Sequence, residues 1–187
     1  MPLANKTKRL PVEEIPLLLS AIGRDRDQQA YKRVFYFYYQ DLVRYSFSIV
    51  RDYSIAEDVV ADVLLKLWLL EGKAMEIQNL SFYLFRAVKN SSLNELTKLQ
   101  RQDSLDQNYE VMDPQNPEQL TISKEFVANI EHAIELLPPK CKTVFLLVRE
   151  QQLSYAEAAD LLGISINTVN RHVQLALSKL YELINKK

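Results

Sequence analysis

One segment near the carboxyl end of this chain restricts its possible folds more than any other. It runs from Ser154 to Val173 and reads SYAEAADLLGISINTVNRHV. Ser154 and Glu157 stand at the spacing of a capping box, so we expect a helix to begin there. Gly163 is expected to end that helix, because the residue just past a helix often adopts the left-handed conformation that glycine reaches without strain. The apolar stripe of this short helix is predicted at Ala156, Ala159 and Leu162.

A second helix is expected after Ser165, whose hydroxyl suits the N-cap position. Its apolar face is predicted at Val169, Val173, Ala176, Leu177, Leu180 and Ile184. Its polar face carries Asn167, Arg171, Gln174 and Ser178, with Asn170 on the flank. An ordinary helical hairpin with a solvated face would also explain the caps. The polar face holds few Glu or Lys, however, and amides and guanidinium groups make paired hydrogen bonds with purine edges, which favours a helix-turn-helix that enters a DNA major groove.

Composition points to an all-α protein. Hydrophobic residues make up 48% of the 187 residues and only three are glycine, so a packed helical core is expected. No apolar stretch approaches the roughly 20 residues of a membrane span, and the basic N-terminus lacks a signal-peptide pattern. We therefore expect a cytoplasmic protein without stable membrane insertion. The single Cys141 excludes an internal disulfide and a Cys-rich zinc site, so neither a metal nor a cofactor is expected.

The charge pattern predicts two small helical domains joined by a flexible linker. The stretch from Gln102 to Leu120 is acidic, contains two prolines and lacks apolar periodicity. The predicted organisation is a variable N-terminal segment at 1–25, a helical domain at 26–100, an acidic linker at 101–122 and a second helical domain at 123–187. The net charge of −1 is low for a protein that binds DNA alone, because phosphate binding relies on excess positive charge. A larger partner is therefore expected to supply affinity.

The first domain is predicted to contain three helices. The first has its apolar positions at Phe35, Tyr38, Leu42, Tyr45 and Ile49. The second runs from Ile55 to about Leu70 behind a capping box of Ser54 and Glu57. Its packing residues are predicted to be Val59, Val60, Val63, Leu67 and Leu70. Asp58, Asp62 and Lys66 line another face of this helix, and the simplest interpretation is a solvated stripe with an Asp62–Lys66 ion pair.

The third helix is predicted from Ser81 to about Leu99, after a loop at Glu71–Leu80. It mixes aromatic, basic and amide side chains at Phe82, Tyr83, Arg86, Lys89, Asn90, Asn94 and Lys98. Basic groups that reach phosphates beside rings that stack on bases suit single-stranded or melting DNA. Aromatic residues at helical spacing are more often core, and Phe85 is expected there.

Together these stretches resemble the extracytoplasmic-function group of bacterial RNA polymerase sigma factors, from about Arg26 onward. Residues 56–68, which end in Trp68, are similar to region 2.2 of that group. Residues 82–98 are similar to regions 2.3 and 2.4, residues 136–145 to the opening of region 4, and residues 164–169 to the start of its recognition helix. Each motif alone is weak, but all of them in this order, with an acidic stretch between, are specific.

The resemblance implies a function and a set of contacts. Asp58, Asp62 and Lys66 would face the clamp coiled coil of core RNA polymerase. The loop Glu71–Leu80 would hold a flipped base of the promoter −10 element. The remaining −10 contacts would come from Phe82, Tyr83, Arg86, Lys89, Asn90 and Lys98. The second domain would bind the polymerase flap and read the −35 element through Asn167, Thr168, Asn170, Arg171 and Gln174. An anti-sigma factor would be a further partner.

Two other classes remain as alternatives. A one-component transcriptional regulator would join a helical sensory domain to a helix-turn-helix resembling the LuxR type, and it would bind a palindrome by itself. The acidic helix that ends in Trp68 and the basic, aromatic third helix favour the sigma factor, because a sensory domain needs neither. An enzyme is disfavoured, since the sequence shows no paired carboxylates beside a base, no Ser/His/Asp set and no phosphate-binding glycine loop.

Overall fold

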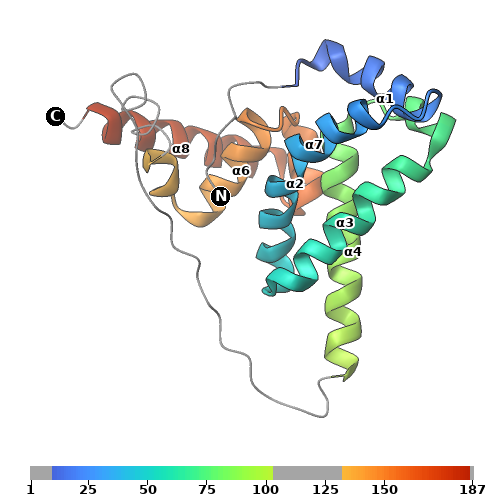
Figure 1. The fold of residues 1–187 in the computed structure, drawn as a ribbon. Coiled ribbons are helices and arrows are strands. Elements are labelled where there is room, and N and C mark those ends of the chain that lie inside the picture. The colour runs from blue at the N-terminus through green and yellow to red at the C-terminus, as the bar shows by residue number, and fades with distance from the viewer. Residues whose placement is uncertain (1–9, 103–131, 186–187) are drawn as a thin grey trace. The chain divides into compact units, whose positions relative to one another are not determined.

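The computed structural model describes residues 10–102 and 132–185, and these residues form helices, turns and no strand (Figure 1). They belong to two compact units, Met1–Val111 and Met112–Lys187. The all-α, two-domain fold is therefore confirmed. Nearly all of the predicted linker at 101–122, and the start of the second predicted domain, lie outside the described residues. The exact domain boundaries stay a prediction.

The first unit is built on three long helices. They are α2 (Gln28–Val50), α3 (Tyr53–Leu69) and α4 (Leu80–Gln102). Each of the three packs against the other two. Two smaller elements precede them, η1 (Val12–Glu14) and α1 (Ile15–Gly23). A further 3-10 helix, η2 (Glu71–Glu76), connects α3 to α4 and packs against α1.

The core of this unit contains large side chains from all three long helices. The fully buried residues include Val34, Tyr38 and Leu42 from α2, Val60, Leu64 and Leu67 from α3, and Leu80 and Leu84 from α4. Phe85 is buried as well, as expected. Two buried hydrogen bonds join α2 to α4, one between the Tyr38 hydroxyl and Ser81 Oγ and one between Ser46 Oγ and Ser92 Oγ, each at 2.8 Å. A buried hydroxyl without a partner would cost stability, so the pairs also favour this register of the two helices.

The ends of these helices correct two sequence-based expectations. The predicted capping box of Ser54 and Glu57 is wrong, because the N-cap of α3 is Asp52, whose carboxylate accepts a hydrogen bond from the Ile55 N–H at 3.0 Å. Arg51, just before it, takes a left-handed conformation with φ of 61° and ends α2. The chain therefore leaves one helix and enters the next within two residues, earlier than expected.

The connection between α3 and α4 is also more regular than the predicted loop. Residues 71–76 form η2, and α4 begins at Leu80 rather than at Ser81. The side-chain oxygen of Asn79 accepts a hydrogen bond from the Phe82 N–H at 3.1 Å, so Asn79 caps the first turn of α4. Ser81 is buried against Tyr38 instead.

The second unit contains α6 (Pro139–Arg149), α7 (Tyr155–Leu162) and α8 (Ile166–Asn185). Helix α8 packs against both α6 and α7. One apolar cluster packs α8 against α6 and the residues just before α6. Its buried members are Ala133, Leu137, Cys141, Phe145, Ala176 and Leu180. Cys141 is thus a small, buried residue of this core.

Candidate nucleic-acid and polymerase interfaces

The predicted helix-turn-helix is formed by α7 and α8 with the expected caps. Ser154 Oγ accepts a hydrogen bond from the Glu157 N–H at 3.2 Å, and the Glu157 carboxylate accepts one from the Ser154 N–H at 2.8 Å. This reciprocal pair confirms the capping box. Gly163 ends α7 with φ of 67° and ψ of 35°, the left-handed conformation predicted for it. Ser165 Oγ then caps α8 by accepting a hydrogen bond from the Thr168 N–H at 3.1 Å.

The apolar faces of the two helices are only partly those predicted. In α7 the buried residues are Ala158, Ala159 and Leu161, whereas Ala156 is exposed and Leu162 is half-buried. In an eight-residue helix, three apolar positions define the phase poorly, and tertiary packing selects the face that is covered. In α8, Val169, Val173, Ala176 and Leu180 are buried as expected, but Leu177 is 46% exposed.

The polar face of α8 is exposed where DNA contacts are predicted. Asn167, Asn170, Arg171 and Gln174 are all exposed. They lie on the first two and a half turns of the helix, opposite the buried Val169 and Val173. Such a face presents amide and guanidinium donors in the arrangement that a major-groove recognition helix needs.

Thr168 differs from the other predicted −35 residues. It is half-buried, and its hydroxyl lies 2.8 Å from Ser165 Oγ within the N-terminal cap of α8. Its structural role in the cap is therefore visible. A direct contact with DNA remains a prediction.

One contact behind the recognition helix was not foreseen from the sequence. Cys141 Sγ on α6 lies 3.2 Å from Nδ1 of His172 on α8. His172 is half-buried, and this contact joins the side of the recognition helix to α6. The two residues are 31 positions apart, so only the packing of α8 on α6 could reveal the pair.

Five of the six predicted −10 residues lie close together on the first half of α4, and the sixth, Lys98, lies further along the helix. Arg86 and Asn90 are exposed and Phe82, Tyr83 and Lys89 are half-buried, all within the first three turns of the helix. The Arg86 guanidinium lies over the Phe82 ring, 5.6 Å from its centroid, as in a cation–π contact. The structure therefore brings these five residues together.

Lys98 lies apart from that group. It is twelve residues beyond Arg86, which is about 18 Å along a helix axis and about 120° around it. Its ammonium group pairs with the Glu95 carboxylate at 2.6 Å. It lines one groove together with Asp62 and Lys66 of α3, and none of the other predicted −10 residues lines that groove.

Asp58, Asp62 and Lys66 are exposed on α3, on one side of the buried stripe, as predicted. Tyr39 of α2 lies beside the start of this row. Burial raises its pKa, and the negative charges of Glu57 and Asp58 raise it further. A hydrogen bond to the Glu57 carboxylate contributes to the same increase in the pKa of Tyr39.

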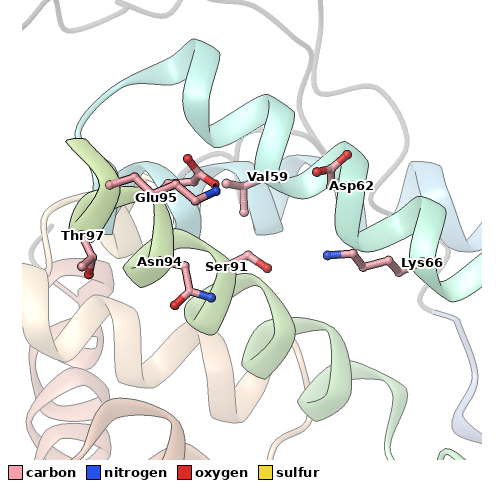
Figure 2. Close-up of a pocket in the computed structure, with 8 residues that line it drawn as sticks. Val59, Asp62, Lys66, Ser91, Asn94, Glu95 and Thr97 are labelled. Carbon is pink, nitrogen blue, oxygen red and sulfur yellow. Dashed lines mark hydrogen bonds and ion pairs between the residues drawn. The ribbon is translucent and has the colours of Figure 1, made fainter. Parts of the chain in front are cut away.

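A groove of about 480 Å³ separates this row on α3 from the second half of α4. Asp62 and Lys66 line one side, and Ser91, Asn94, Glu95 and Lys98 are among the residues that line the other. Figure 2 shows Lys66 extending from α3 toward the gap and Ser91 facing it from α4. Among the residues in this view, no ion pair joins Asp62 to Lys66, so the expected pair along α3 is not seen.

Within residues 10–102 and 132–185, no group of three or more His, Cys, Asp or Glu side chains could hold a metal ion. Across the same part of the chain, no helix is long and apolar enough to cross a membrane.

Comparisons with known proteins agree with this geometry. Residues 37–102 match the family model "Sigma-70 region 2", and residues 128–180 match "Sigma-70, region 4". The curated relative RNA polymerase sigma factor SigZ of Bacillus subtilis (strain 168) is 26% identical over 147 residues, which are 79% of this chain and 82% of the relative.

Two solved structures are similar to this chain. The sigma factor RpoE, solved with the anti-sigma factor NepR from Bartonella quintana, is 22% identical with a TM-score of 0.50, over 84% of this chain and 98% of that one. CnrH, solved with the cytosolic domain of CnrY, is 19% identical with a TM-score of 0.49, over 91% of this chain and 97% of that one.

The two region matches occur in sigma-factor order, together cover more than half of the chain, and coincide with the two structural units. This chain therefore belongs to the sigma-70 family of transcription initiation factors. Because only residues 103–127 separate region 2 from region 4, it is a sigma factor of the extracytoplasmic-function group, which binds core RNA polymerase and directs it to promoters. The alternative of a LuxR-like regulator is not supported by these matches.

Proposed function

We propose that this sigma factor reads the −35 element with the exposed face of α8. The observation that carries the proposal is the exposure of Asn167, Asn170, Arg171 and Gln174 on a helix whose opposite side is anchored by buried Val169 and Val173. An anchored recognition helix holds its polar side chains at a constant depth in the major groove. Thr168 would contribute mainly by stabilising the first turn of α8.

The first unit would supply the other two contacts of a sigma factor. Phe82, Tyr83, Arg86, Lys89 and Asn90 would face the −10 element from the first half of α4. This group combines cations with rings, and it suits a strand whose bases are exposed on melting. Lys98 was predicted to join them, and it lies eight residues beyond Asn90, about 12 Å along the helix axis, where its ammonium group pairs with Glu95.

Docking on core polymerase would use the exposed row on α3. Asp58 and Asp62 are one helical turn apart and carry the same charge, with Lys66 one turn further on. A row of acidic side chains beside a negative field from Glu57 is complementary to a basic partner surface. The clamp coiled coil implied by the family resemblance would be that partner.

A charge reversal tests this docking surface. Asp58→Lys combined with Asp62→Lys places like charges opposite the proposed basic partner, which costs several kcal/mol at an interface. We expect loss of holoenzyme assembly, measured by co-purification with core polymerase and by run-off transcription. The helical circular dichroism and the melting temperature should stay close to wild type, because lost surface ion pairs contribute less than ~1 kcal/mol each.

Glu13→Lys combined with Asp25→Lys is the matched control. Both side chains are exposed, and the pair changes the net charge by the same amount on a different surface. It should assemble normally. A folded Asp58/Asp62 variant recovered with polymerase at wild-type yield would show that α3 is not the docking surface.

Regulation by an anti-sigma factor is a further part of the proposal. The fold relative RpoE was solved bound to one, NepR. The sigma surfaces described above must reach polymerase and DNA together, so a protein that covers either surface would block initiation. We place the whole cycle in the cytoplasm, where core polymerase and promoter DNA are found.

A further inference from the structure

The groove between α3 and α4 joins two residue sets that the sequence analysis had assigned to different partners. Asp62 and Lys66 were predicted to face polymerase, and Lys98 was predicted to face DNA. All three line one groove of about 480 Å³ (Figure 2). A groove of this size is large enough to receive side chains from a partner, so one partner is expected to occupy it.

The charges in the groove are balanced. Asp62 and Glu95 supply two carboxylates, and Lys66 and Lys98 supply two ammonium groups. Lys98 already pairs with Glu95 at 2.6 Å, which reduces its attraction for an incoming anion. A phosphodiester strand brings negative charge alone and would meet both carboxylates. The lining is therefore poorly matched to nucleic acid, whose binding depends on excess positive charge.

The same lining suits a protein surface that carries charges of both signs. A basic side chain can approach Asp62, while a carboxylate of the partner can approach Lys66. Ser91 and Asn94 add a hydroxyl and an amide that both donate and accept hydrogen bonds. Ser91 is half-buried and Asn94 is exposed, so a partner would meet hydrogen-bonding groups both within the groove and at its rim.

We propose that the core-polymerase docking surface continues from the acidic row on α3 across this groove to Ser91, Asn94, Glu95 and Lys98 on α4. The occupant is a segment of core polymerase that bears both acidic and basic side chains. This inference rests on the proposed docking of α3. It reassigns Lys98 from −10 DNA to the polymerase interface, and it adds the second half of α4 to that interface.

Two substitutions test the proposal through separate binding steps. Asn94→Trp places a large side chain at the groove, and the affinity of the full-length protein for core polymerase should fall at least about tenfold. Lys98→Ala removes one charged contact without adding bulk, and the same affinity should fall about threefold. With core polymerase saturated by the variant, promoter affinity and its salt dependence should equal those of wild type.

Gln40→Trp and Lys32→Ala are the matched controls. Both residues are exposed on α2, and neither lines the groove. Each should leave core affinity unchanged. Circular dichroism and melting temperature establish that Asn94→Trp is folded, and Lys98→Ala removes only an exposed side chain, so it keeps the test informative if the tryptophan variant does not fold.

Two results would overturn the proposal. In the first, Lys98→Ala leaves core affinity at the wild-type value but weakens promoter binding, with a salt slope smaller by about one, as expected for a lost phosphate contact. In the second, both groove variants behave as wild type in every measurement. If the Asp58/Asp62 reversal still abolishes assembly in that case, docking on α3 stands and only its extension to α4 is wrong.

Discussion

At the scale of single residues, different side chains of α8 pack against the protein and are proposed to contact DNA. Val169 and Val173 are buried, while Arg171 between them is exposed. A guanidinium on such a face can make two parallel hydrogen bonds to a guanine edge, and a phosphate contact cannot discriminate between bases in this way. The role of Arg171 is therefore measurable by sequence preference as well as by affinity.

Arg171→Ala should cost ~1–3 kcal/mol at one position of the −35 element and relax the base preference there. The measurement is holoenzyme binding to a set of promoters with each −35 base changed in turn. An equal loss on all of them would identify Arg171 as a phosphate contact, and no loss would place the DNA-facing side of α8 elsewhere.

The stability of the first unit at high pH is expected to depend on Tyr45. It packs edge-on against Phe85 at 5.3 Å between ring centroids, and burial raises its pKa from 10.0 to about 12. Because the folded state holds the phenol proton more tightly than the unfolded state, this contribution to stability is complete below pH 10 and is lost as the pH rises toward 12.

We expect Tyr45→Phe to resist alkaline unfolding better than wild type, relative to the stability of each protein at neutral pH. Denaturant unfolding between pH 9 and 12 or so, followed by circular dichroism, measures this difference. Tyr36→Phe is the control, because Tyr36 is 76% exposed. A wild-type alkaline profile for Tyr45→Phe would mean that ionisation of Tyr45 does not limit stability there.

At the scale of elements, the helix-turn-helix depends on one backbone conformation. Gly163 has φ of 67° and ends α7 in the left-handed region. Its N–H donates to the carbonyl groups of Ala159 and Asp160 at the helix end, and the Ile164 N–H donates to the Ala159 carbonyl as well. A Cβ at this position would meet no atom within 4 Å, so any effect of a substitution comes from the backbone rather than from a clash.

Gly163→Ala should therefore destabilise the α7–α8 turn by about 1 kcal/mol, the usual cost of a left-handed non-glycine residue. Amide hydrogen exchange of α7 and the first turn of α8 should become faster. Gly72→Ala is the matched control, because its Cβ also has open space but its φ is not left-handed. Equal protection in both variants would show that the left-handed turn contributes little.

At the scale of the whole molecule, charge limits what the protein does alone. Its 23 basic and 24 acidic residues leave a net charge of −1. Because counterion release from phosphates supplies much of DNA affinity, a nearly neutral protein with two small proposed DNA-binding surfaces gains little from electrostatics. Core polymerase would supply affinity by holding both units on one promoter at the same time.

We expect weak promoter binding by the isolated chain and clear, specific binding by the holoenzyme, compared by footprinting at physiological salt. The control is an equal concentration of core polymerase alone. Tight footprinting by the free chain would contradict the requirement for polymerase and would favour an autonomous regulator.

Local chemistry explains why so much could be predicted from the sequence. The capping box at Ser154, the turn at Gly163 and the cap at Ser165 depend on residues within three or four positions of each other, and all three are confirmed. The family resemblance rests on motifs of the same local kind, and the region 2 and region 4 matches confirm it. The roles of individual site residues remain predictions.

Tertiary structure decided what depends on residues far apart in the chain. Ser81, at the predicted start of the third helix, is buried against Tyr38 of α2 instead, and Asn79 caps α4. The contact of Cys141 with His172 and the groove that unites Lys66 with Lys98 have no local signal. Hydrogen bonds at a helix end form between residues that are close in sequence. The face that a helix buries, and the helix with which it forms a groove, depend on how whole helices pack against each other.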